Sequence, residues 1–378
     1  MAVYLDCNAT TPLEPAVMAV VTRFMERDYG NAASPIHDYG VFARMAVEHA
    51  RGQVAEVAGA RRDEVIFTSG ATEANNLALL GLADHGLATG RRHVIGTAIE
   101  HKAVLEPLEV LARRGFDVEL LPVGKSGRLD PARLREALRP DTLLVSTMHV
   151  NNETGVVQPL TQLAEILADH GAFWHVDAAQ GFGKELDGLR NPRIDLIAVS
   201  GHKIHAPKGV GALVARKRDR AFPPLRPLMH GGGQEQGLRP GTLPVPLIAG
   251  LGEAAKLALR NHGERTDANR AFRETLLAAL APLEPALNGD QDHVLPHAVN
   301  LSLAGIEADR AITALKGVIA VSSTSACTSH TRAPSHVLTA MGLFPERVET
   351  SLRLSWCHLT PAVDWNAVVA ILRGLRAP

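Results

Sequence analysis

The chain has little cysteine. Cys7, Cys327 and Cys357 stand far apart among 378 residues, and no two of them form a CxxC pair. An odd number of widely spaced cysteines predicts neither a disulfide framework nor a zinc knuckle. The 17 histidines are scattered too, and His202 and His205 have no cysteine or carboxylate at ligand spacing. The sequence therefore predicts no metal site and favours a reducing compartment.

The chain also lacks an excess of charge of either sign and lacks a long apolar run. Lys and Arg total 39 against 40 Asp and Glu, a net charge of −1. Such a balance gives no general attraction to nucleic acid or to an anionic membrane. No uncharged stretch approaches the roughly 18 apolar residues of a membrane span, and the N-terminus does not read as a signal peptide. We expect a cytoplasmic protein without a direct nucleic-acid or membrane partner.

What the sequence does contain is a repeated alternation of short apolar runs and helical stretches. This pattern predicts a mainly parallel sheet with helices on its faces. In such sheets, ligands bind beyond the carboxyl ends of the strands. The predicted strands cover residues 64–68, 93–98, 142–150, 172–176 and 196–200. Each of these strands is followed by polar, chemically capable residues.

The pattern changes after residue 214. A basic, proline-rich segment and a glycine-rich loop lead into a helical stretch predicted from 246 to about 281. Short strands and helices follow, which is typical of an α+β domain. The sequence thus predicts a large α/β domain over residues 15–255. Residues 1–14 and 256–378 are expected to form a smaller α+β domain.

Lys203 lies on a tight turn directly after one of the predicted strands. Taken alone, a lysine at such a place is most often a solvated side chain. Here Ser200, Gly201 and His202 precede it, so a hydroxyl, a glycine, an imidazole and an amine stand at one strand end. Together these groups can hold a phosphate and present an amine for a Schiff base. The combination points to a lysine that carries pyridoxal phosphate.

Two other strand ends could serve the same cofactor. The backbone amides around Ala71 and the hydroxyl of Thr72 open a predicted helix, so they can bind a phosphate or act as an ordinary helix cap. His101 could stack on an aromatic ring and move protons, although a lone histidine is more often structural. Neither signal is specific alone.

Asp177 follows a very apolar run and needs a cationic partner, because a buried lone carboxylate is costly. A protonated pyridine nitrogen is such a partner, and it keeps the cofactor electron-withdrawing. Asn152 and Gln180 can donate hydrogen bonds to the phenolic oxygen of the ring. Jointly, these residues predict a pyridoxal phosphate site.

A series of motifs resembles the class V cysteine desulfurases (NifS/IscS-like) of the pyridoxal phosphate aminotransferase superfamily. The resemblance runs from YLDCNATTP near the N-terminus to TSLRLSW near the C-terminus, which is most of the chain. It implies the fold type I (aspartate aminotransferase-like) architecture with a mainly parallel seven-stranded sheet. The motifs between these ends are SGATEANN, EHKAVLEPL, MHVNNETGVVQ, HVDAAQ, SGHKIHAPKGVGAL, HGGGQEQGLRPGTLP and SSTSACTSHTRAPSHVL.

The resemblance also implies the roles of individual residues. Lys203 would carry the cofactor, and His101 would stack on its ring as acid and base. Thr242 would reach the phosphate from the neighbouring subunit of a homodimer. Asn152 and Arg353 would hold the substrate carboxylate, which a planar guanidinium binds in a bidentate way. The residues implied to bind the cofactor are Ala71, Thr72, His101, Asn152, Asp177, Gln180, Ser200, His202, Lys203 and Thr242.

Cys327 is the catalytic cysteine that the resemblance implies, on a loop of the small domain. Its thiolate would attack the sulfur of L-cysteine, leaving alanine and a persulfide that passes to an acceptor protein. A free cysteine is most often buried and inert, but the Ser/Thr-rich residues 322–335 are a poor core. For Cys7 and Cys357, which stand beside apolar runs, the inert reading is favoured.

Within the family, residues 90–109 and 288–302 most resemble the desulfurases that supply sulfur for DNA phosphorothioate modification. Alternatives stay open at this point. They are a housekeeping sulfur donor for iron-sulfur cluster assembly or tRNA thiolation, and a selenocysteine lyase or aminotransferase of the same fold. An assembly subunit with a residual cofactor site is disfavoured by the presence of Lys203, Asp177, His101 and Cys327.

Overall fold

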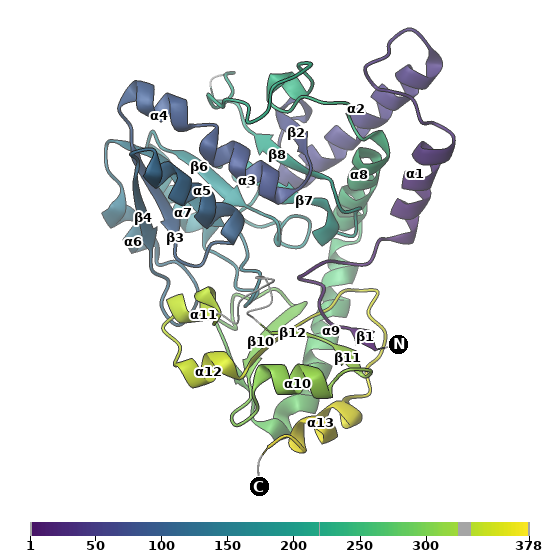
Figure 1. Ribbon diagram of the computed structural model, residues 1–378, viewed down its shortest axis with the longest axis vertical. Coiled ribbons are helices and arrows are strands. Elements are labelled where there is room, and N and C mark those ends of the chain that lie inside the picture. Colours follow the sequence, from purple (N-terminus) through teal and green to yellow (C-terminus); the bar gives the residue numbers. More distant parts are fainter. Residues whose placement is uncertain (1, 219, 324–333, 377–378) are drawn as a thin grey trace.

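The fold is described here from a computed structural model, which covers residues 2–218, 220–323 and 334–376 (Figure 1). A large upper part contains the main sheet, and a smaller lower part contains both termini. Cys327 lies outside the described residues.

The main sheet has seven strands in the order β2-β8-β7-β6-β5-β3-β4. All neighbours are parallel except β8, which is antiparallel to both β2 and β7. The expected mainly parallel seven-stranded sheet is therefore confirmed. The strands are β2 (Val65–Thr68), β3 (His93–Thr97), β4 (Asp117–Leu121), β5 (Thr142–Met148), β6 (Phe173–Asp177), β7 (Leu196–Ser200) and β8 (Gly211–Ala215).

Helices cover both faces of this sheet. On one face, Phe67 and Val199 pack in a core with a first group of four helices, which are named below. On the other face, Ile66, Ala198 and Leu213 pack in a second core with α3 and α5. Burial of both faces explains why the strands read as continuous apolar runs. The first group is α1 (Pro15–Glu26), α2 (Asp38–Ala58), α7 (Leu160–Leu167) and α8 (Val245–Arg260). The other helices of the upper part are α3 (Ala71–Leu80), α4 (Ala83–Thr89), α5 (Lys102–Arg113) and α6 (Pro131–Ala137).

The lower part is built on a four-stranded antiparallel sheet in the order β12-β13-β10-β9, with β1 paired to β11 beside it. Leu5 packs with Leu276, Leu301 and Leu352 in one core, so the N-terminal segment joins the C-terminal elements. The division into two domains remains a prediction. The elements are β1 (Val3–Tyr4), α9 (His262–Leu280), β9 (Ala286–Leu287), β10 (Ala298–Ser302), α10 (Ala308–Ala314), β11 (Ile319–Ala320), β12 (Ser322–Ser323), α11 (His336–Ala340), α12 (Pro345–Glu349), β13 (Ser351–Ser355) and α13 (Trp365–Arg373).

The prediction of a single helical stretch over residues 246–281 is wrong in one respect. The structure has two helices there, α8 and α9, separated at Asn261, whose backbone angles of φ −102° and ψ 16° are not helical. Asparagine favours such breaks because its short polar side chain competes for backbone hydrogen bonds. The break lets α8 pack in the upper part while α9 runs into the lower part (Figure 1).

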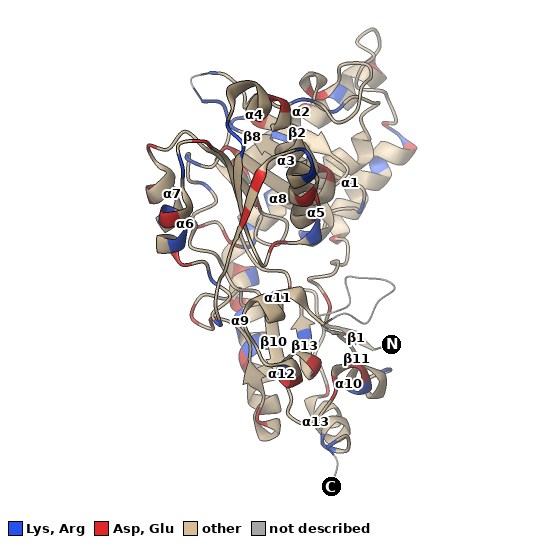
Figure 2. Ribbon diagram, turned by 60° about the vertical axis from the view of Figure 1, so that its left-hand side comes forward, with Lys and Arg blue, Asp and Glu red and all other residues tan. Residues whose placement is uncertain are grey.

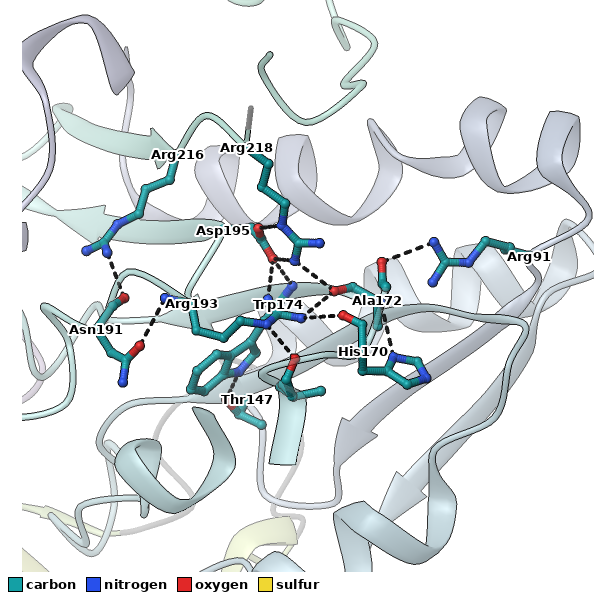
Figure 3. A network of polar contacts seen from close by, with 12 residues as sticks. Arg91, Thr147, His170, Ala172, Trp174, Asn191, Arg193, Asp195, Arg216 and Arg218 are labelled. Carbon is teal, nitrogen blue, oxygen red and sulfur yellow. Dashed lines mark hydrogen bonds and ion pairs between the residues drawn. The ribbon is translucent and has the colours of Figure 1, made fainter. Parts of the chain in front are cut away.

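A buried carboxylate fastens the amino ends of β6 and β7 (Figure 3). Asp195 accepts hydrogen bonds from the backbone N–H of Trp174 at 2.6 Å and from Arg193 at 2.9 Å, and Arg218 also donates to it. Both arginines donate to the carbonyl oxygen of Ala172 as well. This network lies at the edge of the sheet opposite to the carboxyl ends of the strands.

Charged residues of both signs are spread over both parts of the molecule, in keeping with the net charge of −1 (Figure 2). Among the described helices, none combines the length and the apolar character that crossing a membrane requires.

Candidate active site

A cavity of about 500 Å³ lies at the carboxyl ends of the central strands, where the upper and lower parts meet. Its size falls within the range of about 300–1,000 Å³ that is typical of small-molecule sites. The cavity brings together residues from both parts that the sequence analysis singled out. Those that line it are Ala71, Thr72, His101, Asn152, Asp177, Gln180, Ser200, His202, Lys203 and Arg353.

One end of the cavity suits a phosphate. Strand β2 ends at Thr68 and α3 begins at Ala71, so the first backbone amides of this helix have no acceptor within it. Such amides, at the positive end of a helix dipole, bind anions. A β-carbon on Gly211 of β8 would lie 2.6 Å from the α-carbon of Gly70. Glycine at position 211 therefore lets β8 pack directly against the backbone of the turn at Gly70.

The floor of the cavity carries a buried carboxylate at the end of β6. Asp177 is 5% exposed and accepts hydrogen bonds from the side chain of Asn75 at 2.8 Å and from the backbone N–H of Ala179 at 2.9 Å. Two buried acceptor atoms nearby, Asn75 Oδ1 and Gln180 Oε1, have no partner among the described residues. A protonated pyridine nitrogen can donate its one N–H to the Asp177 carboxylate, so the residues present fit pyridoxal phosphate.

Lys203 enters the cavity from the 3₁₀ turn Gly201–Lys203 that follows β7. Its Nζ donates to the carbonyl oxygen of Ala9 at 2.9 Å and also to that of Asn8. The side chain of Gln180 donates to the same Asn8 oxygen at 2.9 Å. The N-terminal segment thus completes the wall beside the lysine.

His101 caps the amino end of α5 and lines the cavity. Its Nδ1 accepts the backbone N–H of Ala103 at 3.1 Å, so a neutral ring carries its proton on Nε2. Burial lowers the pKa of His101, with the nearby Lys203 acting in the same direction. The imidazole is therefore held neutral near pH 7, and it can donate from Nε2.

Arg353 projects from β13 of the lower part toward the cavity. It is 3% exposed and donates to Asp6 at 2.7 Å, to Ser322 at 3.1 Å and to the carbonyl oxygen of Asn152 at 3.1 Å. Its Nε is buried without a partner among the described residues. A fixed guanidinium with a spare donor can bind a small carboxylate.

Two predicted site residues are not placed in this cavity. Thr242 is exposed on the chain described here and does not line the cavity. Cys327 lies outside the described residues, but the two flanking segments are close to the site. Ser322 contacts Arg353, and Ser335 donates a hydrogen bond to Glu153, the neighbour of Asn152.

Sequence reasoning missed the roles of Asn8 and Asn75. Asn75 belongs to the motif SGATEANN, in which the helical spacing from Ala71 would have placed it one turn into α3. Asn8 acts through its backbone carbonyl, and because every residue has this group, the residue type gives no sign of the role. Its position inside YLDCNATTP was the only available signal.

Comparison with known proteins identifies the family of this chain. The family model described as aminotransferase class-V matches residues 3–366. Cysteine desulfurase IscS of Rickettsia bellii is 45% identical over 374 residues, covering 98% of this chain and 90% of the relative. Cysteine desulfurase IscS of Escherichia coli is 42% identical over 376 residues, covering 99% and 92%.

Solved structures agree. DndA from Streptomyces lividans is 52% identical, with a TM-score of 0.82 and coverage of 94% of this chain and 98% of that one. SspA in complex with cysteine is 34% identical, with a TM-score of 0.83 and coverage of 95% and 100%. The chain therefore belongs to the class-V aminotransferase family, among its pyridoxal phosphate-dependent cysteine desulfurases.

Proposed function

We propose that this protein takes sulfur from L-cysteine, releases L-alanine and passes the sulfur to an acceptor protein as a persulfide of Cys327. In the balanced step, the carbon–sulfur bond of the substrate breaks and a sulfur–sulfur bond to Cys327 forms. The electron pair of the carbon–sulfur bond stays on the carbon, which takes up one proton, and Cys327 gives up its thiol proton, so the atoms and charges balance. No external oxidant or reductant is needed.

One observation carries the proposal most strongly: Lys203 and Arg353 line the same cavity although they come from different parts of the molecule. An amino acid offers a carboxylate for the guanidinium and an amino group for chemistry next to the lysine. Asn152 lies between the two parts, because its carbonyl accepts from Arg353 and from Asn8. These positions support a small amino acid as the substrate.

The chain's own residues would bind the cofactor and move protons. Pyridoxal phosphate, when bound, supplies an electron-withdrawing ring that stabilises negative charge next to the substrate carboxylate. Ala71, Thr72, Ser200 and His202 would hold its phosphate, and Asp177 would keep its ring nitrogen protonated. The amine of Lys203 would take the α-proton of the substrate, and Nε2 of His101 would supply a proton.

We also propose a homodimer. The loop after α1 and the start of α2 carry several large apolar side chains that are exposed in the single chain. Contiguous exposed apolar residues of this kind typically mark an interface. They are Tyr29 at 67%, Ile36 at 93%, Tyr39 at 51%, Phe42 at 55% and Met45 at 63% exposure. In this dimer Thr242 would reach the phosphate of the partner's site.

The proposed destination of the sulfur is DNA phosphorothioate modification, through a protein of that machinery and without direct contact to DNA. The 52% identity to DndA exceeds the 42–45% identity to the IscS relatives. The IscS relatives favour the second candidate, a housekeeping role in iron-sulfur assembly or tRNA thiolation. We place the protein in the cytoplasm, where its buried free thiols Cys7 and Cys357 would stay reduced.

The test measures sulfide and alanine from L-cysteine under reductant, with the visible absorption band of the cofactor recorded in parallel. We expect equal amounts of both products from the wild type. Cys327→Ser should keep the band and make no sulfide, whereas Lys203→Ala should lose both. A wild type that has a normal band but forms neither product would refute the activity.

The proposed destination of the sulfur needs a separate experiment. Transfer of labelled sulfur is compared between an acceptor of the phosphorothioation machinery and an iron-sulfur scaffold. Preferred transfer to the scaffold would contradict the proposed destination and leave the desulfurase activity intact.

A further inference from the structure

A second cluster of reactive side chains lies behind the active site, outside the cavity described above. One donor atom each of His205, Cys357 and His358 lie within 4.8 Å of one another. The thiols of Cys7 and Cys357 are hydrogen-bonded to each other. All four side chains line one small cavity of about 50 Å³.

Both histidines are held as metal-binding histidines usually are. Nδ1 of His205 faces the carbonyl oxygen of Pro12 at 3.0 Å, and Nε2 of His358 faces the carboxylate of Glu14 at 3.1 Å. Each of these nitrogens must donate its proton to the oxygen, so the other nitrogen of each ring offers a lone pair. An oxygen acceptor on the far nitrogen is the usual support of a histidine ligand.

The protonation states suit ligation. Burial lowers the pKa of His205 to about 3 and also lowers the pKa of His358, so both rings are neutral at pH 7. The hydrogen bond between the two thiols lowers the pKa of Cys357 and raises that of Cys7, so the pair shares one proton more readily than it loses two. Metal ions bind neutral imidazole and thiolate.

The backbone holds His205 firmly in this position. Its φ of 70° lies in the left-handed region, which non-glycine residues adopt at a cost of about 1 kcal/mol or more. Its N–H donates to the hydroxyl of Thr11 at 2.9 Å. Thr11, Pro12 and Glu14 all belong to the N-terminal segment, so one short stretch orients both rings.

We propose that Cys7, His205, Cys357 and His358 together bind one Zn²⁺ ion per chain. In a tetrahedral site with the usual bond lengths, neighbouring ligand atoms are about 3.4–3.8 Å apart. The donor atoms of His205, Cys357 and His358 lie within 4.8 Å of one another, so binding would draw them closer together. Cys7 would join them through its contact with Cys357. Two thiolates would cancel the charge of the ion, so the loaded site would add no net charge near Lys184, which lines the same small cavity.

The site would act as a structural clamp. Its ligands come from the N-terminal segment, the turn after Lys203 and the residues after β13. Cys7 directly precedes Asn8, whose carbonyl accepts from Lys203. Cys7, Thr11 and Cys357 also line a further cavity of about 560 Å³.

This inference departs from the sequence analysis, which predicted no metal site and inert cysteines at positions 7 and 357. Spacing along the chain gave no signal because the four ligands come from three segments that only the fold brings together. Cys357 and His358 are adjacent, which is not a recognised ligand spacing by itself.

The test uses the reduced, cofactor-loaded full chain after dialysis against a chelator. Co²⁺ is titrated first because its tetrahedral thiolate complexes absorb visible light strongly, and Zn²⁺ is then used to displace it. We expect one Co²⁺ per chain with a tetrahedral thiolate spectrum, and a higher Tm with Zn²⁺. Cys357→Ser and His358→Gln should weaken binding at least about 100-fold, and Glu14→Gln about 10–100-fold.

Cys327→Ser is the matched control, since it removes a cysteine outside the cluster and should leave the Co²⁺ spectrum unchanged. The cofactor band shows whether each variant has folded. Three results would each overturn the proposal: no Co²⁺ retained, a spectrum lost in Cys327→Ser but kept in Cys357→Ser, or a disulfide between Cys7 and Cys357 in the purified protein.

Discussion

Glu100 is a carboxylic acid that lies entirely inside the protein. Oε1 accepts hydrogen bonds from the hydroxyl of Thr97 at 2.6 Å and the backbone N–H of Met148 at 2.8 Å, whereas Oε2 has no partner among the described residues. Burial raises the pKa of Glu100 to about 8, and the charge of Asp177 acts in the same direction. Glu100 is therefore mostly protonated at neutral pH, directly before His101.

This shift makes stability depend on pH. In the unfolded chain Glu100 titrates near 4.5, and in the folded protein near 8. Between these values the unfolded state binds fewer protons, so the free energy of unfolding falls as the pH rises. Glu100→Gln removes this loss. Urea unfolding should show the variant more stable than the wild type at pH 9, by up to a few kcal/mol, with the difference shrinking toward pH 5.

The matched control is Glu109→Gln, which removes a carboxylate from the exposed face of α5. It should change the unfolding free energy by no more than about 0.5 kcal/mol at either pH. If Glu100→Gln differs from the wild type by the same amount at pH 5 and pH 9, the buried acid does not titrate as described.

At the residue scale, the sequence predicted the residues that line the active-site cavity better than it predicted the buried residues around them. Lys203, Asp177 and His101 were expected together because each follows a strand of one parallel sheet, and they do line one cavity. The burial of Glu100 could not be predicted, because its partners stand on β3 and β5. Register between strands is a property of the folded sheet.

At the element scale, Asp195 links β6 and β7 at their amino ends, and its side chain is 2% exposed and lies between Arg193 and Arg218. Asp195→Ala would leave two cations without their common anion and the N–H of Trp174 without its acceptor. Loss of one partner from a buried pair typically costs about 3–5 kcal/mol. We expect a matching loss of unfolding free energy, measured in urea with the cofactor bound.

The comparison variant is Asp63→Ala, which removes an ion pair with Lys217 in which the Asp63 side chain is 55% exposed. Exposed pairs contribute about 0–1 kcal/mol. An equal loss in both variants would show that the Asp195 network does not carry the stability assigned to it.

In the main sheet, the strands that the sequence predicted are buried on both faces. The five predicted strands read as apolar runs because each packs between two helix layers. β4 was missed because it is the edge strand and its Asp117 and Glu119 are exposed. β8 was missed because GALVA begins at the glycine that supports the turn at Gly70, and the short run resembles a loop.

At the scale of the whole molecule, the proposed dimer makes a further prediction. Phe42→Glu and Met45→Glu together would place two charges in the apolar interface, where burying unpaired charge is costly. The double variant should sediment as a monomer. It should also bind the cofactor more weakly, because Thr242 of the partner would be lost.

Phe344→Glu is the control, since this phenylalanine is 71% exposed and precedes α12, far from the start of α2 (Figure 1). It should remain dimeric. A dimeric Phe42/Met45 double variant, or a Phe344→Glu monomer, would contradict the assigned interface.

The pairing of the N-terminal strand also limits when the protein can finish folding during translation. Val3 of β1 pairs with Ile319 of β11, so the first structured residues wait for partners made about 300 residues later. At roughly 5–20 residues per second, the ribosome takes tens of seconds to cover that distance. During this interval the main sheet can form, but the Asn8 and Ala9 carbonyls that contact Lys203 are not yet anchored. The nascent chain therefore acquires its finished cofactor pocket only after β11 has been made.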